Sequence, residues 1–353
     1  MVYKIGIAGV THGHVSAHFR EWREVPNTQL VAIADANVQE RRRYLQRAEL
    51  TGLHEYDSIE QMLEKEELDV VSVCNETSNH APVVELAASK KAHCIVEKPL
   101  AFRLADAERM LAAAGKYGTQ VVTNYPTRWG PRATPRALEF VRRGGIGRPY
   151  EVRHRGGGTK PRTIDANTFF KWLYQPAFNG AGAFADYCCY GADMAAGVLG
   201  VPSSVYAIAG RWQRDDLITD DNARMLLQYQ RGGAVIEATW SQFGHLPFST
   251  MFLGEEATLA IGHGGAVLYT KENEGDGGRE LTNDDLPAPA EEPNLPAHLI
   301  ARLEKGERAV ESAGIRHHRD VAEILDAGLR SVKSQQVVRL PLPLPLMQAA
   351  DYV

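Results

Sequence analysis

The chain has 353 residues, a length that favours two domains over one. Apolar residues make up 44% of it and charged residues 24%, as in an ordinary globular protein. The net charge of −5, with no block of like charges, argues against nucleic-acid binding. No apolar run approaches the roughly 18 residues of a membrane-spanning helix, and the start lacks the pattern of a signal peptide. We therefore expect a soluble protein with no membrane partner.

The cysteines carry information about the cellular compartment. The chain has Cys74, Cys94, Cys188 and Cys189, and none of them forms a Cys-x-x-Cys pair. This pattern argues against a disulfide framework and against a zinc site. Free thiols in a reducing cytoplasm are the simplest interpretation, so we expect a cytoplasmic protein without a metal.

Residues 1–125 alternate short β-rich runs with longer helical patterns. The predicted strands are Tyr3–Ala8, Gln29–Asp35, Asp69–Cys74, Ala92–Glu97 and Gln120–Asn124. Helices are predicted between them, at Val15–Glu24, Gln39–Leu50, Ile59–Lys65, Ala81–Lys90 and Leu104–Tyr117. Alternation of this kind predicts a doubly wound parallel sheet covered on both faces, which is a Rossmann-type α/β domain.

The pattern changes after residue 125, where we place the start of a second domain, residues 126–335. Helices are predicted at Thr134–Arg143, Phe184–Leu199 and His318–Ser334. Strands are predicted at Ser204–Gln213, Ala223–Gln230, Ala234–Phe243, Ser249–Leu253, Ala257–Ile261 and Ala266–Tyr269, with a surface loop at Asn273–Asn294. This order predicts an α+β domain with a mainly antiparallel sheet. Residues 336–353 are predicted to be an extended segment that packs back on the protein, with its prolines excluding a central strand.

The first predicted strand runs into a glycine-containing loop and then a helix. Glycine allows the tight turn and close backbone approach that a dinucleotide needs, and the helix N-terminus offers free N–H groups to a pyrophosphate. The spacing departs from Gly-x-Gly-x-x-Gly, because Thr11 and His14 stand where glycines are expected. The loop residues proposed for the cofactor are Gly9, Thr11, His12, Gly13 and His14.

Asp35 ends the second predicted strand, 26 positions after Gly9. A carboxylate there can accept hydrogen bonds from the ribose hydroxyls and would repel a 2′-phosphate, which favours NAD over NADP. Arg41, Arg42 and Arg43 follow closely and could compensate, so NADP stays open; the alternative for Asp35 itself is a helix cap. His12, His14 and His18 suggest a metal site, but with no carboxylate or cysteine nearby in sequence we prefer a role in shaping the loop.

A second motif stands at the end of the fourth predicted strand, in Glu97-Lys98-Pro99. Strand, Glu-Lys-Pro and helix together resemble the glucose-fructose oxidoreductase/inositol dehydrogenase/MocA-type (Gfo/Idh/MocA) oxidoreductase family. The resemblance covers nearly the whole chain: it extends to the loop after the first strand, to Cys74–His80, to Asn124–Pro131 and to His318–Leu342.

The resemblance implies a nicotinamide cofactor and residues that hold it. Beside the five loop residues and Asp35, the cofactor set is Asn75, Thr77, His80, Glu97, Lys98 and Asn124. It also places Lys98 near the nicotinamide and the reacting hydroxyl, with Glu97 orienting it. A partly desolvated lysine can have a lowered pKa, which would let Lys98 take part in proton transfer.

The family's second active-site motif is Asp-x-x-x-His on a helix preceded by glycines. Here Asp186 matches, but Tyr190 stands where the family usually has histidine. Positions 186, 190 and 193 share one helix face. We expect Tyr190 to replace the histidine as acid/base or oxyanion donor, with its pKa lowered by Lys98 if the two lie close. A substrate-positioning or structural tyrosine remains an alternative.

The candidate catalytic residues are thus Lys98, Asp186 and Tyr190. The candidate substrate-binding residues are these three with Arg128, Lys171 and Trp172. Lys160 and Arg162 are similar candidates for an anionic substrate group, although such residues are more often simply solvated.

The leading expectation is hydride transfer between NAD and a sugar, cyclitol or related polyol. The resemblance also allows an enzyme that keeps NAD bound and uses transient oxidation for elimination or glycoside cleavage. A third interpretation, suggested by the missing histidine and the irregular loop, is a non-catalytic NAD(P)-binding regulator. A homodimer or homotetramer through the open sheet of the second domain is expected by the same resemblance.

Overall fold

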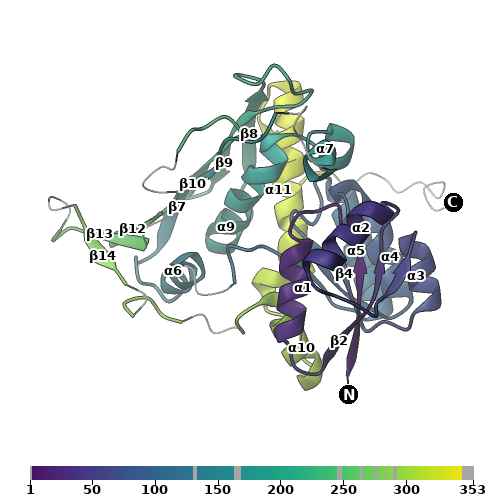
Figure 1. The fold of residues 1–353 in the computed structure, drawn as a ribbon. Coiled ribbons are helices and arrows are strands. Elements are labelled where there is room, and N and C mark those ends of the chain that lie inside the picture. The colour runs from purple at the N-terminus through teal and green to yellow at the C-terminus, as the bar shows by residue number, and fades with distance from the viewer. Residues whose placement is uncertain are drawn as a thin grey trace.

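The computed structural model of the chain describes residues 2–129, 133–162, 168–244, 249–262, 265–273, 275, 277–282, 284–288 and 292–343. These residues form a six-stranded and a nine-stranded sheet, with helices packed on both (Figure 1). The predicted fold class, a Rossmann-type domain followed by an α+β domain, is confirmed.

All pairings in the first sheet are parallel, in the order β3-β2-β1-β4-β5-β6. Its strands are β1 Tyr3–Ala8, β2 Thr28–Ala34, β3 His54–Tyr56, β4 Val70–Val73, β5 His93–Glu97 and β6 Val121–Asn124. The helices are α1 Val15–Glu24, α2 Val38–Arg47, α3 Ile59–Lys65, α4 His80–Ser89 and α5 Leu104–Tyr117. The short edge strand β3 was not predicted, because it is polar and exposed at its first two residues.

The strand order reverses between β1 and β4, and this reversal positions the nucleotide site. The loops that follow the two strands run in opposite directions, so a crevice opens between them at the carboxyl ends. Gly9, after β1, and Asn75, after β4, meet across that crevice.

The second sheet has the order β14-β13-β12-β11-β7-β10-β9-β8-β15, and among the described strands only β7 and β10 pair in parallel. Its strands are β7 Pro149–Gly157, β8 Ser204–Gly210, β9 Asn222–Tyr229, β10 Gly232–Thr239, β11 Thr250–Gly254, β12 Ala257–Gly262, β13 Gly265–Thr270, β14 Arg279–Leu281 and β15 Val338–Arg339. Two of these were missed: β14 lies in the predicted loop Asn273–Asn294, and β7 lies at the centre of the sheet. In β7 only Val152 and His154 are buried. Because one of these two inward residues is a histidine, the sequence lacks the apolar–polar alternation that indicates a strand.

The remaining helices are α6 Ala133–Arg142, α7 Thr168–Leu173, α8 Pro176–Asn179, α9 Cys189–Leu199, α10 Leu295–Lys305 and α11 Ile315–Ser334. The predicted helix Phe184–Leu199 is not α-helical throughout: it opens with a π-helical turn at Phe184–Cys188 and continues as α9. The last helix begins at Ile315 rather than His318. The helices α7, α8 and α10 were not predicted.

Helices from the end of the chain pack on both sheets. α11 lies between the two halves (Figure 1), and Asp326 on it accepts a hydrogen bond from Leu104 N of α5 at 3.0 Å. Ser331 Oγ accepts one from Ala207 N of β8 at 2.9 Å. α10 packs on α1 and adds Leu295 and Leu299 to the core of the first sheet.

The last described residues pack against the second sheet and α11. β15 pairs antiparallel with β8 at the edge of the sheet, and Leu342 N donates to Glu323 Oε1 of α11 at 2.6 Å. Residues 344–353 of the predicted extended segment lie outside the described residues. Within the described part of the chain, the structure contains no helix with the length and hydropathy required to cross a membrane.

We predict that a glycine-to-alanine substitution has opposite effects on the free energy of unfolding in α11 and in α5. A Cβ at Gly328 in α11 would lie 2.5 Å from Phe184 Cζ and 2.9 Å from Met225 Sδ, both fully buried. Overpacking of this kind costs about 1–3 kcal/mol, so Gly328→Ala should lower the free energy of unfolding. Nothing lies within 4 Å of a Cβ at Gly115 in α5, so Gly115→Ala should raise it by roughly 0.5–1 kcal/mol. Urea denaturation measures both, and stabilisation by Gly328→Ala would contradict the packing argument.

Candidate active site

The three predicted catalytic residues come together between the two sheets. Lys98 follows β5, and its Nζ donates to Asp186 Oδ1 at 2.9 Å and to the Asp186 carbonyl oxygen at 3.3 Å. The same Nζ lies 5.0 Å from the centre of the Tyr190 ring. Lys98 and Asp186 are buried. The π-helical turn that holds Asp186 and the first turn of α9, which holds Tyr190, therefore face the end of β5, and π-helical turns occur frequently at functional sites.

Two residues complete the surroundings of the Asp186 carboxylate. Trp240 Nε1 donates to Asp186 Oδ2 at 3.0 Å, and Lys160 Nζ lies 3.6 Å from the same oxygen. Lys160 also lies over the ring of Tyr187, 5.0 Å from its centre. No sequence motif points to Trp240. Lys160 was predicted together with Arg162 as a candidate for an anionic group, but the exposed guanidinium of Arg162 faces Asp215.

Ionisation at this cluster differs from the expectation for Lys98. Burial would lower the pKa of Lys98, but the charge and hydrogen bond of Asp186, together with Tyr190 and Cys189, raise that pKa well above its ordinary value. Burial would raise the pKa of Asp186, and Lys98 and Lys160 instead hold it below its usual range. The predicted lowering of the Lys98 pKa is therefore wrong, because a buried lysine beside a carboxylate stays an ammonium.

Tyr190 also differs from expectation. Burial raises the pKa of its phenol, and Lys98 opposes this rise without reversing it. The predicted lowering by Lys98 is wrong, because burial raises the pKa of this phenol by more than the ammonium lowers it. At neutral pH Tyr190 is a protonated phenol, which can donate a proton or a hydrogen bond.

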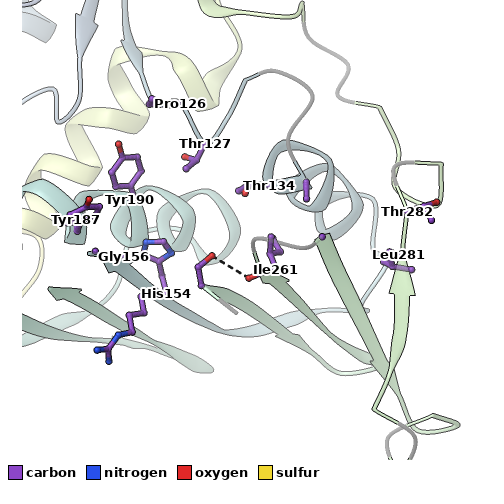
Figure 2. Close-up of a pocket in the computed structure, with 16 residues that line it drawn as sticks. Pro126, Thr127, Thr134, His154, Gly156, Tyr187, Tyr190, Ile261, Leu281 and Thr282 are labelled. Atoms are coloured by element: carbon purple, nitrogen blue, oxygen red, sulfur yellow. Dashed lines mark hydrogen bonds between the residues drawn. The ribbon is translucent and has the colours of Figure 1, made fainter. Parts of the chain in front are cut away.

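A cavity of about 870 Å³ adjoins the cluster and is lined by Tyr190 and Tyr187. Figure 2 shows these tyrosines and His154 at one end of the cavity, with Leu281 and Thr282 at the other. Hydroxyl groups line much of the wall, from Thr127, Thr134, Ser249 and Thr282 together with the two tyrosines. Convergent polar groups in a cavity of this size suit a small polar ligand.

A second cavity, of about 350 Å³, lies at the crevice of the first sheet and is lined by Gly9, Thr11, Asp35 and Asn75 among others. Gly9 has φ +84°, and a Cβ on it would lie 2.7 Å from Asn75 Cβ, so only glycine fits the turn. Asp35 accepts from Val10 N and Asn37 N, both at 2.7 Å, and thus fixes the loop as well as facing the cavity.

An unpaired side-chain group lies at this second cavity: Asn75 Oδ1 is buried and has no hydrogen-bond partner among the described residues. α1, which follows the loop, begins without a side-chain cap, and Val15 N and Ala17 N donate to the carbonyl oxygens of His12 and His14. The glycine turn, the acidic residue after β2 and the unpaired amide oxygen together fit a dinucleotide.

The Glu97 carboxylate contacts the nucleotide loop and α1 rather than the Lys98 ammonium. Its carboxylate lies 3.0 Å from His14 Nδ1 and 2.7 Å from His18 Nε2, and it accepts from Asn124 Nδ2 at 2.7 Å. His12 Nδ1 lies 3.8 Å away. Burial would raise the pKa of Glu97, but the histidines lower it well below its ordinary value. Glu97 also accepts a hydrogen bond from the backbone N–H of Lys98 at 3.2 Å. Among the described residues, no hydrogen bond from Glu97 to the Lys98 side chain supports the expected orienting role.

The other predicted cofactor residues have mainly structural contacts. The ring of His80 lies 3.1 Å from the Leu100 carbonyl oxygen and 3.3 Å from that of Asn75, which ties the turns after β4 and β5 together. Thr77 is buried in a short 3₁₀ turn, and Gly13 lies in the turn that leads into α1. These two line neither of the cavities described above.

Three further residues were predicted to bind the substrate, and each has different surroundings. Lys171 is exposed. Trp172 is buried, and its Nε1 donates to the Thr11 carbonyl oxygen at 2.9 Å, which links α7 to the nucleotide loop. Arg128 makes a two-point ion pair with Asp193, at 2.8 and 2.9 Å. The guanidinium of Arg128 is therefore engaged with Asp193, and neither residue lines the ligand cavity.

The comparisons with known proteins agree with this geometry. Residues 3–125 match the model of the oxidoreductase family with an NAD-binding Rossmann fold, and residues 135–260 match the C-terminal domain of the same GFO/IDH/MocA family. The two matches cover well over half of the chain. The chain belongs to the Gfo/Idh/MocA oxidoreductase family, and the predicted resemblance is confirmed, as is the nicotinamide-binding character of the first domain.

Two curated relatives share part of the sequence. A D-apiose dehydrogenase from Paraburkholderia graminis is 35% identical over 38% of this chain and 35% of its own length. A myo-inositol 2-dehydrogenase from Thermotoga maritima is 27% identical over 56% of this chain and 55% of its own. The chain thus spans about a third to a half of the length of these relatives.

Solved structures resemble the whole chain in fold. A levoglucosan dehydrogenase in complex with NADH and levoglucosan superposes with a TM-score of 0.78 at 19% identity, covering 97% of this chain and all of that one. The aldose-aldose oxidoreductase from Caulobacter crescentus gives a TM-score of 0.76 at 21% identity, covering 96% of this chain and all of that one. At such identities the likeness establishes the fold alone.

We predict that Asp186→Asn destabilises the protein in a pH-dependent way. Removing one partner of a buried ion pair costs about 3–5 kcal/mol, since Lys98 is left uncompensated. The pKa of Asp186 is lowered by folding, so its contribution is present above about pH 4 and is lost as the pH falls. The pKa of Lys98 is raised, so its contribution is present below about pH 10 and is lost as the pH rises.

The measurement is urea unfolding of the wild type and the variant across this range. The difference between the two should be largest near neutral pH and shrink at both extremes. Lys98→Met combined with Asp186→Asn is the matched control, and it should recover part of the loss because the uncompensated charge is gone. A difference that does not vary with pH would contradict the assignment.

Proposed function

We propose that this protein is an NAD-dependent dehydrogenase or reductase that acts on a CH–OH group of a sugar, cyclitol or related polyol. The observation that carries the proposal is the Lys98–Asp186–Tyr190 cluster, which joins the end of a Rossmann strand to a hydroxyl-lined cavity. The dehydrogenases among its relatives, named for D-apiose and myo-inositol, support a polyhydroxylated substrate.

The cofactor site favours NAD over NADP. Asp35 presents a carboxylate to the crevice, and Asp57 lines the same cavity. Arg41, which could otherwise neutralise a 2′-phosphate, is buried and donates to Glu55, Asp57 and two backbone carbonyl oxygens. Arg43 is paired with Glu40. An additional phosphate would therefore face the Asp35 carboxylate, while Arg41 and Arg43 are already engaged with other carboxylates.

The proton is handled by Tyr190. A bound nicotinamide supplies or accepts the hydride, and the substrate oxygen gains or loses a proton in the same reaction. In the reducing direction the protonated phenol of Tyr190 donates its proton to the carbonyl oxygen, which becomes a hydroxyl. The ammonium of Lys98, held 5.0 Å from the ring, stabilises the phenolate that results. Asp186 keeps Lys98 charged and in place; the oxidising direction reverses these steps.

The second sheet offers a surface for self-association. Tyr206 and Ile208 on β8 and Leu226 on β9 are exposed large apolar residues, and Tyr206 and Leu226 are paired across the two strands. Exposed apolar side chains on neighbouring strands favour an interface, and we propose a homodimer or homotetramer through this face. All four cysteines are free and buried, which supports a reducing, cytoplasmic location.

Cofactor binding gives the first test. We expect the wild type to bind NADH tightly and NADPH weakly. Titrations that record nicotinamide fluorescence measure both affinities. Asp35→Ala should weaken NADH binding by about 10–100-fold, because hydrogen bonds to a charged group are lost. Asp35→Asn keeps an oxygen for Val10 N–H but removes the charge, so it should narrow the preference for NADH. Failure to bind either nucleotide would contradict the proposal as a whole.

Turnover tests the role of Tyr190. Tyr190→Phe should lower kcat about 10²–10⁴-fold with NADH affinity unchanged, since general acid–base groups contribute about this much. Tyr187→Phe, a neighbouring tyrosine in the same cavity, is the matched control and should lose less. NAD⁺ reduction with a panel of polyols is the measurement, and wild-type turnover by Tyr190→Phe across the pH range would refute the assignment. Stoichiometric NAD binding without net NADH production would favour an NAD-retaining lyase or a regulator.

A further inference from the structure

The floor of the large cavity is a row of residues that crosses the second sheet from β7 to β14. Each residue of the row stands directly opposite the next one on the neighbouring strand. Residues in such pairs project from the same face of a sheet, and all five are buried. In order, the row is His154, Thr250, Ile261, Ala266 and Leu281.

This row sets the length of the cavity. Neighbouring strands lie about 4.8 Å apart, so the four steps from β7 to β14 span about 19 Å. His154, Ile261 and Leu281, the first, third and fifth residues of the row, all line the cavity of about 870 Å³. A six-membered sugar ring measures only about 5 Å between opposite equatorial oxygens, because its bonds are about 1.5 Å long. The cavity therefore extends well beyond one ring placed at Tyr190.

The part of the cavity away from Tyr190 is lined by Thr134, Ile261, Leu281 and Thr282, and we call it the outer part. Figure 2 shows Thr134 and Ile261 in the middle of the cavity, and Leu281 and Thr282 at the end opposite Tyr190. Thr134 belongs to the first turn of α6 and is half-buried, so its side chain is accessible. The outer part thus combines an apolar floor with a hydroxyl-bearing wall.

The outer part has no positive charge to offer an anion. Among the described residues that line the cavity, Arg155 alone has a permanent charge. It follows the inward-facing His154 on β7, so its side chain projects from the opposite face of the sheet. There it donates to Gln242 Oε1 at 2.9 Å and lies 3.4 Å from the Glu237 carboxylate. A phosphate or carboxylate in the outer part would lose hydration without a countercharge, so an uncharged group is favoured.

We propose that the substrate is a neutral glycoside of at least two rings, with the reacting ring at Tyr190 and a second sugar ring in the outer part of the cavity. The inference rests on the proposed function and names the substrate class of the same site. Thr134 offers a hydroxyl to the second ring, and Ile261 and Leu281 offer apolar surface to its C–H groups. Hydride still leaves or joins one carbon of the first ring. Binding of the remote ring raises kcat/KM without taking part in that step.

Matched pairs of substrates test the proposal on the wild type. NAD⁺-linked turnover is measured with D-glucose, methyl β-D-glucoside and cellobiose, with D-galactose and lactose, and with myo-inositol and galactinol. A two-ring member should exceed its one-ring parent in kcat/KM by about 10–100-fold, mainly through a lower KM. Methyl β-D-glucoside closes the anomeric centre without adding a ring, so it should gain little.

Charged extensions of the same ring test the neutral character of the outer part. α-D-Glucose 1-phosphate and UDP-glucose place phosphate where methyl α-D-glucoside has a methyl group. Both should show a kcat/KM at least about tenfold below that of the methyl glucoside, because the phosphates lose hydration without a countercharge. Preference for UDP-glucose over every neutral glycoside would contradict an uncharged second group.

A substitution that fills the outer part tests its location. Thr134→Trp places an indole over the middle of the row, so the ratio of kcat/KM between the two-ring and the one-ring substrate should fall about 10–100-fold, with NADH affinity unchanged. Arg142→Trp puts the same indole on an exposed position of α6 outside the cavity and is the matched control. It should keep the wild-type ratio. An unchanged ratio in folded Thr134→Trp would overturn the assignment.

The outcomes separate this inference from the proposed function. One-ring polyols that match or exceed all their two-ring partners would overturn the role of the outer part and leave the dehydrogenase in place. This result comes from the wild type, so it does not depend on the folding of a variant. Binding of NADH without turnover of any polyol or glycoside would overturn both.

Discussion

The buried pair of Lys98 and Asp186 is the interaction on which the site depends. The ammonium comes from the end of a strand in the first sheet, and the carboxylate from the helix that covers the second. Neither charge is tolerable alone at this depth, because an unpaired buried charge costs several kcal/mol. The pair therefore fixes how the two halves meet. Burial beside the pair raises the pKa of Tyr190 by more than Lys98 lowers it, and this leaves the phenol protonated.

Structural features that depend on residues close together in the chain could be predicted from the sequence. Five of the six strands of the first sheet follow from short apolar runs, because a strand buried on both faces has to be apolar. The meeting of Lys98, Asp186 and Tyr190 could be anticipated from motifs and from helical spacing. The loop at Gly9 could be anticipated as well, since a positive φ against a neighbouring backbone leaves no alternative to glycine.

Features that depend on distant partners could not be predicted. The Glu97 carboxylate contacts three side chains from residues up to 83 positions away, and nothing in the sequence near His14 and His18 indicates that Glu97 is their partner. The ionisation of Lys98 was misjudged for the same reason, since burial and the distant Asp186 act in opposite directions and only their balance gives the sign. The central strand β7 was missed because His154 occupies an inward position where an apolar residue is expected.

The placement of α10 and α11 has a consequence for biosynthesis. The core of the first sheet contains Leu295 and Leu299 next to Phe19 and Trp22, so that core is built from the two ends of the chain. Until α10 has been synthesised, the apolar side chains that it covers stay open to water and to other chains. A chain interrupted before residue 295 therefore exposes part of a core that it cannot close.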